Sequence, residues 1–241
     1  MKLSAPLYVL KRKARLLSRK NNIPLHEAFD HIASEQGYSS WSLLISKQAG
    51  TLSADELFRQ LMPGDMVLLG ARPGQGKTLL SLELLMRGVD QGNHGAFFTL
   101  EYTEQDVRER LKRIRPEWEY SPKLLVFDTS DAVSADYIMT RMDAAPYGTL
   151  IVVDYLQVLD QRRDKPALME QVEALKKFAE KKGLVLIFIS QIDRFFNPSL
   201  KPYPDMYDIR LPNPLDLSLF NKMCFVQGGT IQMNQCKNNR I

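Results

Sequence analysis

The sequence predicts an α/β protein with a mainly parallel sheet, helices on both of its faces, and a small helical domain in front. Short apolar runs such as 66–69, 150–154 and 184–190 lack polar alternation, as expected for parallel strands buried on both faces. A glycine-rich turn at 70–78 joins the first of these runs to a helical pattern. The first fifth of the chain shows helical spacing instead, which separates it from the sheet domain.

The N-terminal segment is expected to form about three short helices over residues 5–48. Pro24 suits the first turn of a second helix, and Gly37 is a typical helix end. Two helices around a turn give only a weak indication of a helix-turn-helix motif. We therefore expect domains at 1–50 and 51–241. The first helix is predicted from an apolar stripe at Leu7, Leu10, Ala14 and Leu17.

The positive charge of the chain is concentrated in this small domain. Residues 1–50 contain eight Lys/Arg and three Asp/Glu, a net charge of +5, whereas the rest of the chain has a net charge of −1. Clustered cations displace counterions from nucleic-acid phosphates, so a DNA contact is one interpretation and a solvated helix face is the other. The basic residues that form this candidate DNA contact are Lys11, Arg12, Lys13 and Arg15, followed by Arg19 and Lys20.

Composition excludes several classes of protein. Hydrophobic residues make up 44% of the chain and charged residues 25%, which is typical of a globular protein. No apolar run approaches the roughly 20 residues that span a bilayer, and the N-terminus does not resemble a signal peptide. The two cysteines, Cys224 and Cys236, are too few for a disulfide framework or a four-ligand zinc site. We expect a cytoplasmic protein without a membrane partner.

The stretch GARPGQGKT matches the phosphate-binding P-loop pattern, with Ala71 in the first position and Gly76, Lys77 and Thr78 at its end. Glycines let successive N–H groups point at phosphate oxygens, and the helix that follows adds its positive end. Lys77 is expected to reach the outer phosphates, and the Thr78 hydroxyl to bind Mg²⁺. The predicted nucleotide contacts are Ala71, Arg72, Pro73, Gly74, Gln75, Gly76, Lys77, Thr78 and Leu79.

Polar side chains follow three further apolar runs. Asp154 ends the run 150–154 and is expected to complete the Mg²⁺ site with Thr78. Glu101 follows the run 95–100, where a carboxylate can orient and deprotonate water, although it can equally cap the next helix. Gln191 follows the run 184–190 and can sense a terminal phosphate. Such groups at strand ends beside the P-loop strand favour hydrolysis over passive binding.

The motifs GARPGQGKT, TLEYT, IVVDYLQVL and ISQIDR, in this order, resemble the RecA-like ATPase domain of DnaB-type replicative DNA helicases. The later PDMYDIR resembles the segment downstream in that family, so the resemblance covers about residues 52–237. It implies a RecA-like P-loop NTPase fold in which Lys77 and Thr78 bind ATP with Mg²⁺. It also implies that Asp154 is the metal acid, Glu101 the catalytic carboxylate and Gln191 the phosphate sensor. Arg72 and Arg194 would lie near the nucleotide.

In RecA-like folds, the loops after the metal-acid strand and after the sensor strand face a central channel. The first is basic here and contains Arg162 and Arg163, and the second carries Phe195 and Phe196. Aromatic and basic side chains together suit single-stranded DNA, whereas core-anchored aromatics in a Pro-stiffened loop are the other interpretation.

Two departures from the helicases stand out. Residues 1–50 resemble neither their collar domain nor their linker helix. The family carries a Lys-x-Arg element that reaches into a neighbouring subunit, whereas Lys237 and Arg240 are three positions apart. Either the register has slipped by one position and Lys237 and Arg240 are the trans-acting cations, or this element is missing.

The function predicted from these motifs is an ATP hydrolase resembling the motor domain of a DNA helicase. It is expected to depend on Mg²⁺ and to couple hydrolysis to binding of, or movement along, single-stranded DNA. The resemblance also implies a homo-oligomer, either a hexameric ring or an open filament. The alternative is a nucleotide-switched DNA-binding or adaptor protein with little turnover and no unwinding.

Overall fold

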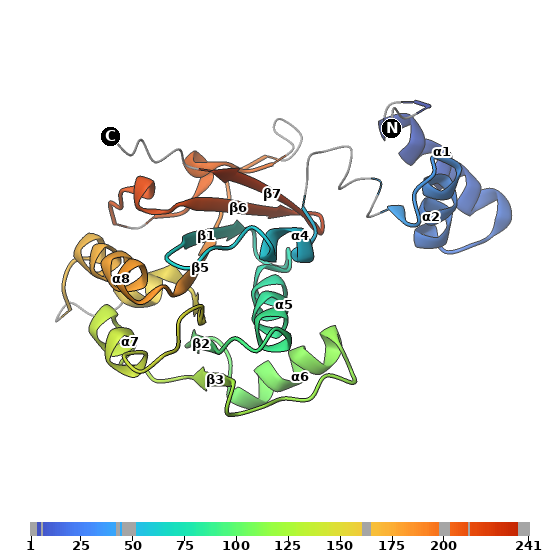
Figure 1. Ribbon diagram of the computed structural model, residues 1–241. Helices are drawn as coiled ribbons and strands as arrows, with labels where there is room; N and C mark the ends of the chain where they lie inside the picture. The colour runs from blue at the N-terminus through green and yellow to red at the C-terminus, as the bar shows by residue number, and fades with distance from the viewer. Residues whose placement is uncertain are drawn as a thin grey trace. The chain divides into compact units, whose positions relative to one another are not determined.

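A computed structural model describes residues 4–5, 7–41, 44, 52–160, 165–197, 203–211 and 213–235 (Figure 1). The chain divides into two compact units, Met1–Ser53 and Ala54–Ile241. We describe each unit by itself, and we refer to the second as the sheet domain.

The described part of the N-terminal unit includes the helices α1 (Leu7–Asn21) and α2 (Leu25–Glu35). Leu10 and Ala14 of α1 and Ala28 and Ile32 of α2 form its small buried core, as helical spacing predicts. The N-cap of α2 is Pro24, and Gly37 adopts a positive φ of 82° just past its end. Leu43, which belongs to the expected third helix, lies outside the described residues.

The sheet domain is built on one seven-stranded sheet with the strand order β3-β2-β4-β5-β1-β6-β7. Every neighbouring pair is parallel except β6 and β7, which confirms the predicted mainly parallel α/β class. The strands are β1 (Met66–Ala71), β2 (Gly95–Thr99), β3 (Leu125–Asp128), β4 (Leu150–Asp154), β5 (Val185–Gln191), β6 (Lys222–Gln227) and β7 (Thr230–Gln235).

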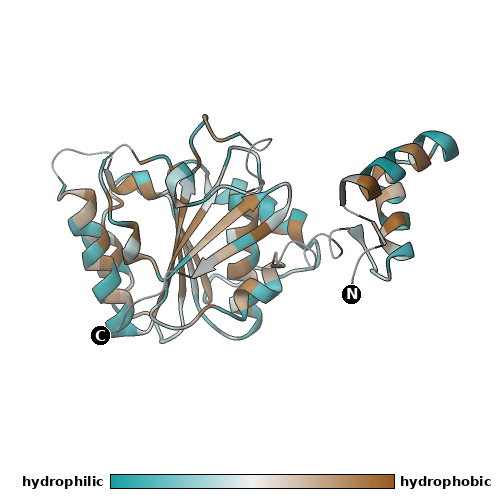
Figure 2. Cartoon of the chain, turned by 90° about the horizontal axis from the view of Figure 1, so that it is seen from above, coloured by the Kyte–Doolittle hydropathy of each residue, from teal (hydrophilic) through white to brown (hydrophobic). Residues whose placement is uncertain are grey.

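Helices cover both faces of this sheet (Figures 1 and 2). On one face, a Cβ added to Gly95 of β2 would meet Leu85 of α5 at 3.0 Å. On the other face, Phe98 of β2 packs in the main core with Ile138 of α7 and Leu175 of α8. The helices are α4 (Ala54–Phe58), α5 (Lys77–Asp90), α6 (Glu104–Ile114), α7 (Ala135–Arg141) and α8 (Leu168–Lys182), with short 3-10 turns η1 (Leu156–Asp160), η2 (Met206–Asp208) and η3 (Leu217–Leu219).

Parallel pairing brings the ends of the predicted strands to one edge of the sheet, which we call the carboxyl edge. Thr99 is paired with Asp154, and Ala71 is paired with Gln191. The expectation that all three polar strand ends lie directly beside the P-loop strand is corrected by the strand order. Only β5, which ends in Gln191, neighbours β1, because β4 is one strand farther and β2 two strands farther.

A hairpin that the sequence analysis did not predict closes the sheet beyond β1. Gly228 and Gly229 connect β6 to β7 with positive φ values of 58° and 77°. Two successive residues with positive φ form the tight turn whose twist suits a β-hairpin, and glycine adopts it without steric penalty. The turn lies at the carboxyl edge, where the Gln75 side chain accepts a hydrogen bond from Gly228 N at 2.8 Å.

Candidate nucleotide-binding site

The P-loop lies between the end of β1 at Ala71 and the start of α5 at Lys77. Gly74 and Gly76 have positive φ values of 76° and 87°, and nothing lies within 4 Å of a Cβ added at either position. Glycine is therefore required here by the backbone conformation and not by crowding. The first N–H groups of α5 lack carbonyl partners within their own helix, so this turn points donors and the positive end of the helix at one place.

Thr78 and Asp154 meet although 76 positions separate them in the chain. The Thr78 hydroxyl donates a hydrogen bond to Asp154 Oδ2 at 3.1 Å, and both side chains are buried. The other carboxylate oxygen, Oδ1, is buried and has no hydrogen-bond partner among the described residues. A buried acceptor without a partner is unfavourable, so this oxygen suits a metal ion or its bound water. A hydroxyl beside a carboxylate is an oxygen donor set that fits Mg²⁺.

Electrostatics around Asp154 reflect this burial. Desolvation is the main cause that raises the pKa of Asp154 to about 6, and the nearby charge of Glu101 adds to it. Lys77, the hydrogen bond from Thr78 and the charge of Arg110 act in the opposite direction. Two carboxylates therefore sit close enough to repel each other, at an edge where a cation would relieve the repulsion.

Glu101 is exposed and lies in the turn between β2 and α6, where its N–H donates to Thr99 Oγ1 at 3.1 Å. The alternative that Glu101 caps the next helix is wrong. The N-cap of α6 is Thr103, which forms a reciprocal capping box with Asp106. The carboxylate of Glu101 is thus not used for capping. The backbone of Glu101 is held two residues beyond Thr99, the residue that pairs with Asp154.

Gln191 is half-buried at the end of β5, beside the end of the P-loop strand. Its carbonyl accepts a hydrogen bond from Arg210 N at 2.8 Å, and Ile192 forms an isolated antiparallel bridge with Ile209. The Arg210 carbonyl accepts a further hydrogen bond from Gln157 Nε2 at 2.8 Å. The segment around Arg210 is therefore attached both to the strand of Gln191 and to η1, which follows Asp154. Tyr155, Gln157, Gln191 and Arg210 line a cavity of about 320 Å³.

The two adjacent phenylalanines expected to contact DNA differ sharply in exposure. Phe195 is 94% exposed, which leaves its ring free to stack. Phe196 is only 6% exposed and belongs to the main core, so its assignment as a stacking residue is wrong. The core-anchored interpretation holds for Phe196, since its ring cannot reach a base from there.

The remaining predicted residues fall into three groups. Arg72 is half-buried within the P-loop, where its carbonyl accepts a hydrogen bond from Gln75 N at 3.2 Å, and Arg194 is exposed. Four predicted cations, Arg162, Arg163, Lys237 and Arg240, lie outside the described residues. The basic residues Lys11, Arg12, Lys13 and Arg15 are all exposed on α1 of the N-terminal unit.

Sequence reasoning missed Arg110, whose charge acts on Asp154 from α6. Its only sequence signal is that it belongs to the helix that follows Glu101. The other basic residues of that helix share this signal. It also missed the contact between Gln75 and the β6–β7 turn, because those residues are 153 positions apart.

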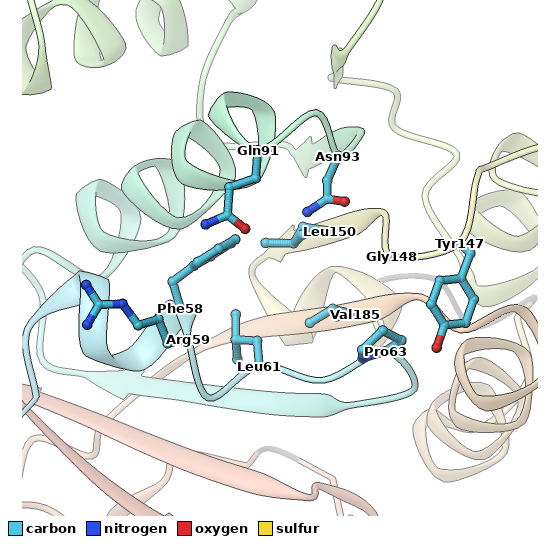
Figure 3. A pocket seen from close by; sticks show the side chains of 10 residues that line it. All are labelled: Phe58, Arg59, Leu61, Pro63, Gln91, Asn93, Tyr147, Gly148, Leu150 and Val185. Carbon is cyan, nitrogen blue, oxygen red and sulfur yellow. The ribbon is translucent and has the colours of Figure 1, made fainter.

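A second cavity of about 320 Å³ opens at the opposite edge of the sheet, which we call the amino edge (Figure 3). Its lining combines apolar side chains such as Phe58, Leu150 and Val185 with Arg59, Gln91 and Asn93. The buried carboxylate oxygen of Asp154, which has no partner among the described residues, and the N-terminus of α5 lie at the carboxyl edge instead. The carboxyl edge is therefore the candidate site.

Within the described part of the chain, no helix has both the length and the apolar composition of a membrane span, and no group of three or more His, Cys, Asp or Glu side chains is arranged to hold a metal ion.

Comparisons with known proteins identify the family to which the chain belongs. The family model described as "ATPase: KaiC" matches residues 48–201. The replicative DNA helicase DnaB of Mycoplasma genitalium is 23% identical over 197 residues, and the match covers 67% of this chain and 42% of the helicase. The chain thus spans less than half the length of this relative.

Solved structures support the fold. A DnaB-like replicative helicase, solved in a study of its interactions with primase, has a TM-score of 0.53 at 18% identity over 90% of this chain and 65% of that chain. A KaiC-like protein of Pyrococcus horikoshii has a TM-score of 0.51 at 17% identity over 76% of this chain and 86% of that chain. The chain belongs to the KaiC ATPase family and contains a RecA-like ATPase domain of the DnaB type.

Proposed function

We propose that this protein hydrolyses ATP in a Mg²⁺-dependent reaction that single-stranded DNA stimulates, and that it couples hydrolysis to binding or translocation on that DNA. Its ATPase domain is of the helicase-motor type. The relative in Mycoplasma genitalium is a replicative DNA helicase, which supports DNA as the partner.

The observation that carries the proposal is the hydrogen bond between Thr78 and Asp154, together with the buried, unpaired Oδ1 of Asp154. This arrangement suits a metal ion held next to the phosphates that the P-loop binds. When bound, Mg²⁺ neutralises charge on the outer phosphates of ATP. Thr78 and Asp154 would hold the ion or its water shell.

The other residues of the carboxyl edge act on the terminal phosphate. Lys77 binds the outer phosphate oxygens, and the side-chain N–H of Gln191 donates a hydrogen bond to the terminal phosphate. Glu101 accepts a proton from a water molecule as that water attacks the terminal phosphorus in line. The bond from phosphorus to the bridging oxygen of ADP then breaks, and ADP and phosphate leave.

DNA contact is proposed for Phe195, beyond the end of β5, together with Arg162 and Arg163. The backbone N–H of Arg210 is hydrogen-bonded to the Gln191 carbonyl, so the segment around Arg210 is connected to β5, the strand that ends in Gln191. Stacking of bases on an exposed ring tolerates any sequence. The basic face of α1, with Lys11, Arg12, Lys13 and Arg15, is proposed as a second, salt-sensitive DNA contact.

We also propose that the protein acts as a homo-oligomer, as a ring or an open filament. The last strand, β7, runs antiparallel to β6 and ends at Gln235 at the amino edge. That edge lies about 20 Å from the P-loop of the same chain, given the usual rise per residue of a strand. Lys237 and Arg240 follow β7 in the sequence, so we propose that they serve the nucleotide site of a neighbouring subunit.

The test is steady-state ATP turnover by the full chain with and without Mg²⁺ and with and without single-stranded DNA, together with the particle mass in solution. We expect turnover only with Mg²⁺, a higher rate with DNA, and a mass above that of one chain. Lys77→Ala serves as the matched inactive protein. ATP binding without turnover under every condition would favour the nucleotide-switched adaptor instead.

A further inference from the structure

Helix α6 carries two arginines that each stack on a tyrosine ring, in different surroundings. The guanidinium carbon of Arg108 lies 4.1 Å from the ring centre of Tyr120, and that of Arg110 lies 4.0 Å from the ring centre of Tyr102. Arg108 also pairs with Glu104, with Nη2 to Oε1 at 2.6 Å. Arg110 forms no ion pair with a carboxylate among the described residues and donates instead to the Asp106 carbonyl at 3.0 Å.

Arg110 points back along α6 toward the nucleotide site. Side chains on a helix lean toward its N-terminus, and α6 begins directly after the turn that contains Glu101 and Tyr102. Tyr102, on which Arg110 stacks, is the residue next to Glu101. The positive charge of Arg110 also lowers the pKa of Asp154, whereas Arg108 is not among the charges that shift it. The guanidinium of Arg110 is thus within electrostatic range of the site.

The charges at this edge explain what Arg110 can do. Glu101 and Asp154 repel each other, and among the described residues Lys77 and Arg110 are the cations that offset the charge of Asp154. Lys77 becomes occupied by phosphate oxygens once ATP binds, under the function proposed above. Of the two cations that act on Asp154, Arg110 then remains available to attract Glu101, and its stack on Tyr102 holds it beside the Glu101 turn.

We propose that Arg110 is a positioning residue for ATP hydrolysis, which holds the turn containing Glu101 and directs its carboxylate to the attacking water. This inference rests on the proposed role of Glu101 as the base. Arg110 itself does not touch ATP. Its removal should therefore slow the chemical step and leave nucleotide binding unchanged.

The test compares five variants of the full chain by kcat, by KM for ATP at saturating Mg²⁺, and by affinity for a non-hydrolysable ATP analogue. Arg110→Met should lower kcat about tenfold while KM and analogue affinity stay within about twofold. Arg110→Lys should restore most of kcat, because it keeps the charge. Tyr102→Leu should lower kcat about threefold through loss of the stack, and Tyr102→Phe should not. Arg108→Met, on the same helix, is the matched control and should change nothing.

A double substitution separates this proposal from the function on which it rests. If Arg110 acts through Glu101, Arg110→Met should have no further effect on kcat in a Glu101→Gln background. Full additivity of the two substitutions would overturn the proposal, and so would a kcat for Arg110→Met within twofold of wild type while Glu101→Gln is slow. A raised KM with unchanged kcat would instead assign Arg110 to nucleotide binding and also overturn it. Normal turnover by Glu101→Gln would overturn the assignment of the base itself.

Discussion

The two edges of the same sheet carry cavities of equal size, about 320 Å³ each, yet the described residues around the two cavities differ in kind. At the carboxyl edge, the P-loop, a buried carboxylate and a strand-end amide converge from three strands that are far apart in the sequence. At the amino edge, loop residues such as Asn93 and Tyr147 help to line the cavity of Figure 3. Lys182, which ends α8 on this edge, is already paired with Asp143.

The difference arises from the direction of the strands. In parallel sheets, all strands end at one edge, where helices begin and point free N–H donors outward. At the other edge, helices end and the chain turns back, so carbonyl groups dominate and anions are not favoured. Cavity volume therefore does not identify the site, whereas unpaired donors and acceptors do. Substitutions at the carboxyl edge should therefore affect ATP turnover more than substitutions at the amino edge.

Removal of the P-loop lysine should have the largest effect. We expect Lys77→Ala to reduce ATP turnover to background, because Lys77 is the P-loop side chain expected to bring its charge to the outer phosphates. The thermal midpoint should shift by no more than about 2 °C, since Lys77 is not part of the core. Lys182→Ala at the amino edge is the matched control. Equal losses of turnover in the two variants would contradict the distinction between the edges.

The carboxylate of Glu101 should be the next most important. Glu101→Gln is expected to slow hydrolysis by about 10²–10⁴-fold and to retain binding of ATP with Mg²⁺, because general-base catalysis contributes that much. Glu104→Gln, which removes an exposed carboxylate of α6 that pairs with Arg108, is the control and should turn over normally. A Glu101→Gln protein that is as active as wild type would remove the base from the proposed mechanism.

Phe195 and Phe196 should separate DNA binding from stability. Phe195→Ala should weaken single-stranded DNA binding by about 5- to 150-fold, since stacking contributes ~1–3 kcal/mol per base. Phe196→Leu should bind DNA normally, whereas Phe196→Ala should lose about 3–5 kcal/mol of folding free energy through the cavity that it leaves. Fluorescence anisotropy and thermal unfolding measure the two effects. Weakened DNA binding in Phe196→Leu alone would reverse the assignment.

The charged carboxylate of Asp154 should lower the stability of the folded chain when no metal is bound. Its pKa is raised to about 6, above the ordinary value of 3.8, so at pH 8 the folded chain carries a carboxylate that burial and Glu101 disfavour. Asp154→Asn should therefore raise the thermal midpoint of the metal-free chain by a few degrees. It should also lose the stabilisation by ATP with Mg²⁺ that wild type shows. A lower midpoint without metal would mean that the hydrogen bond from Thr78 outweighs the cost of burying the Asp154 charge.

Substitution in the amino-edge cavity should have the smallest effect. Tyr147 is 75% exposed and lies against Gly183, where a Cβ would meet its ring at 2.2 Å. We expect Tyr147→Ala to leave ATP turnover and DNA stimulation within about twofold of wild type, because distant sites act independently. A large loss of turnover would show that this edge takes part in the reaction.

The P-loop and the strand-end residues were predicted from the sequence because their signals are local. The glycines of 70–78 indicate a backbone turn with positive φ values. An apolar run that ends in Asp154 or Gln191 indicates a buried strand and its last residue. The roles of Glu101 and Phe196 were less clear, since a strand-end acid can cap a helix and an aromatic in a loop can be exposed or buried. The α6 capping box excludes the capping role of Glu101, and the main core contains Phe196.

What the sequence by itself determined is the kind of site and the edge at which it lies. Residue type and spacing along a few turns specify a phosphate-binding loop, and strand polarity specifies which end of the sheet it occupies. Only the tertiary structure decided which groups meet there. The contact of Thr78 with Asp154, the placement of Arg110 near Asp154 and the order of the strands depend on pairing between segments that are far apart in the chain. Such pairing is set by how whole faces bury together, and no local pattern of residues encodes it.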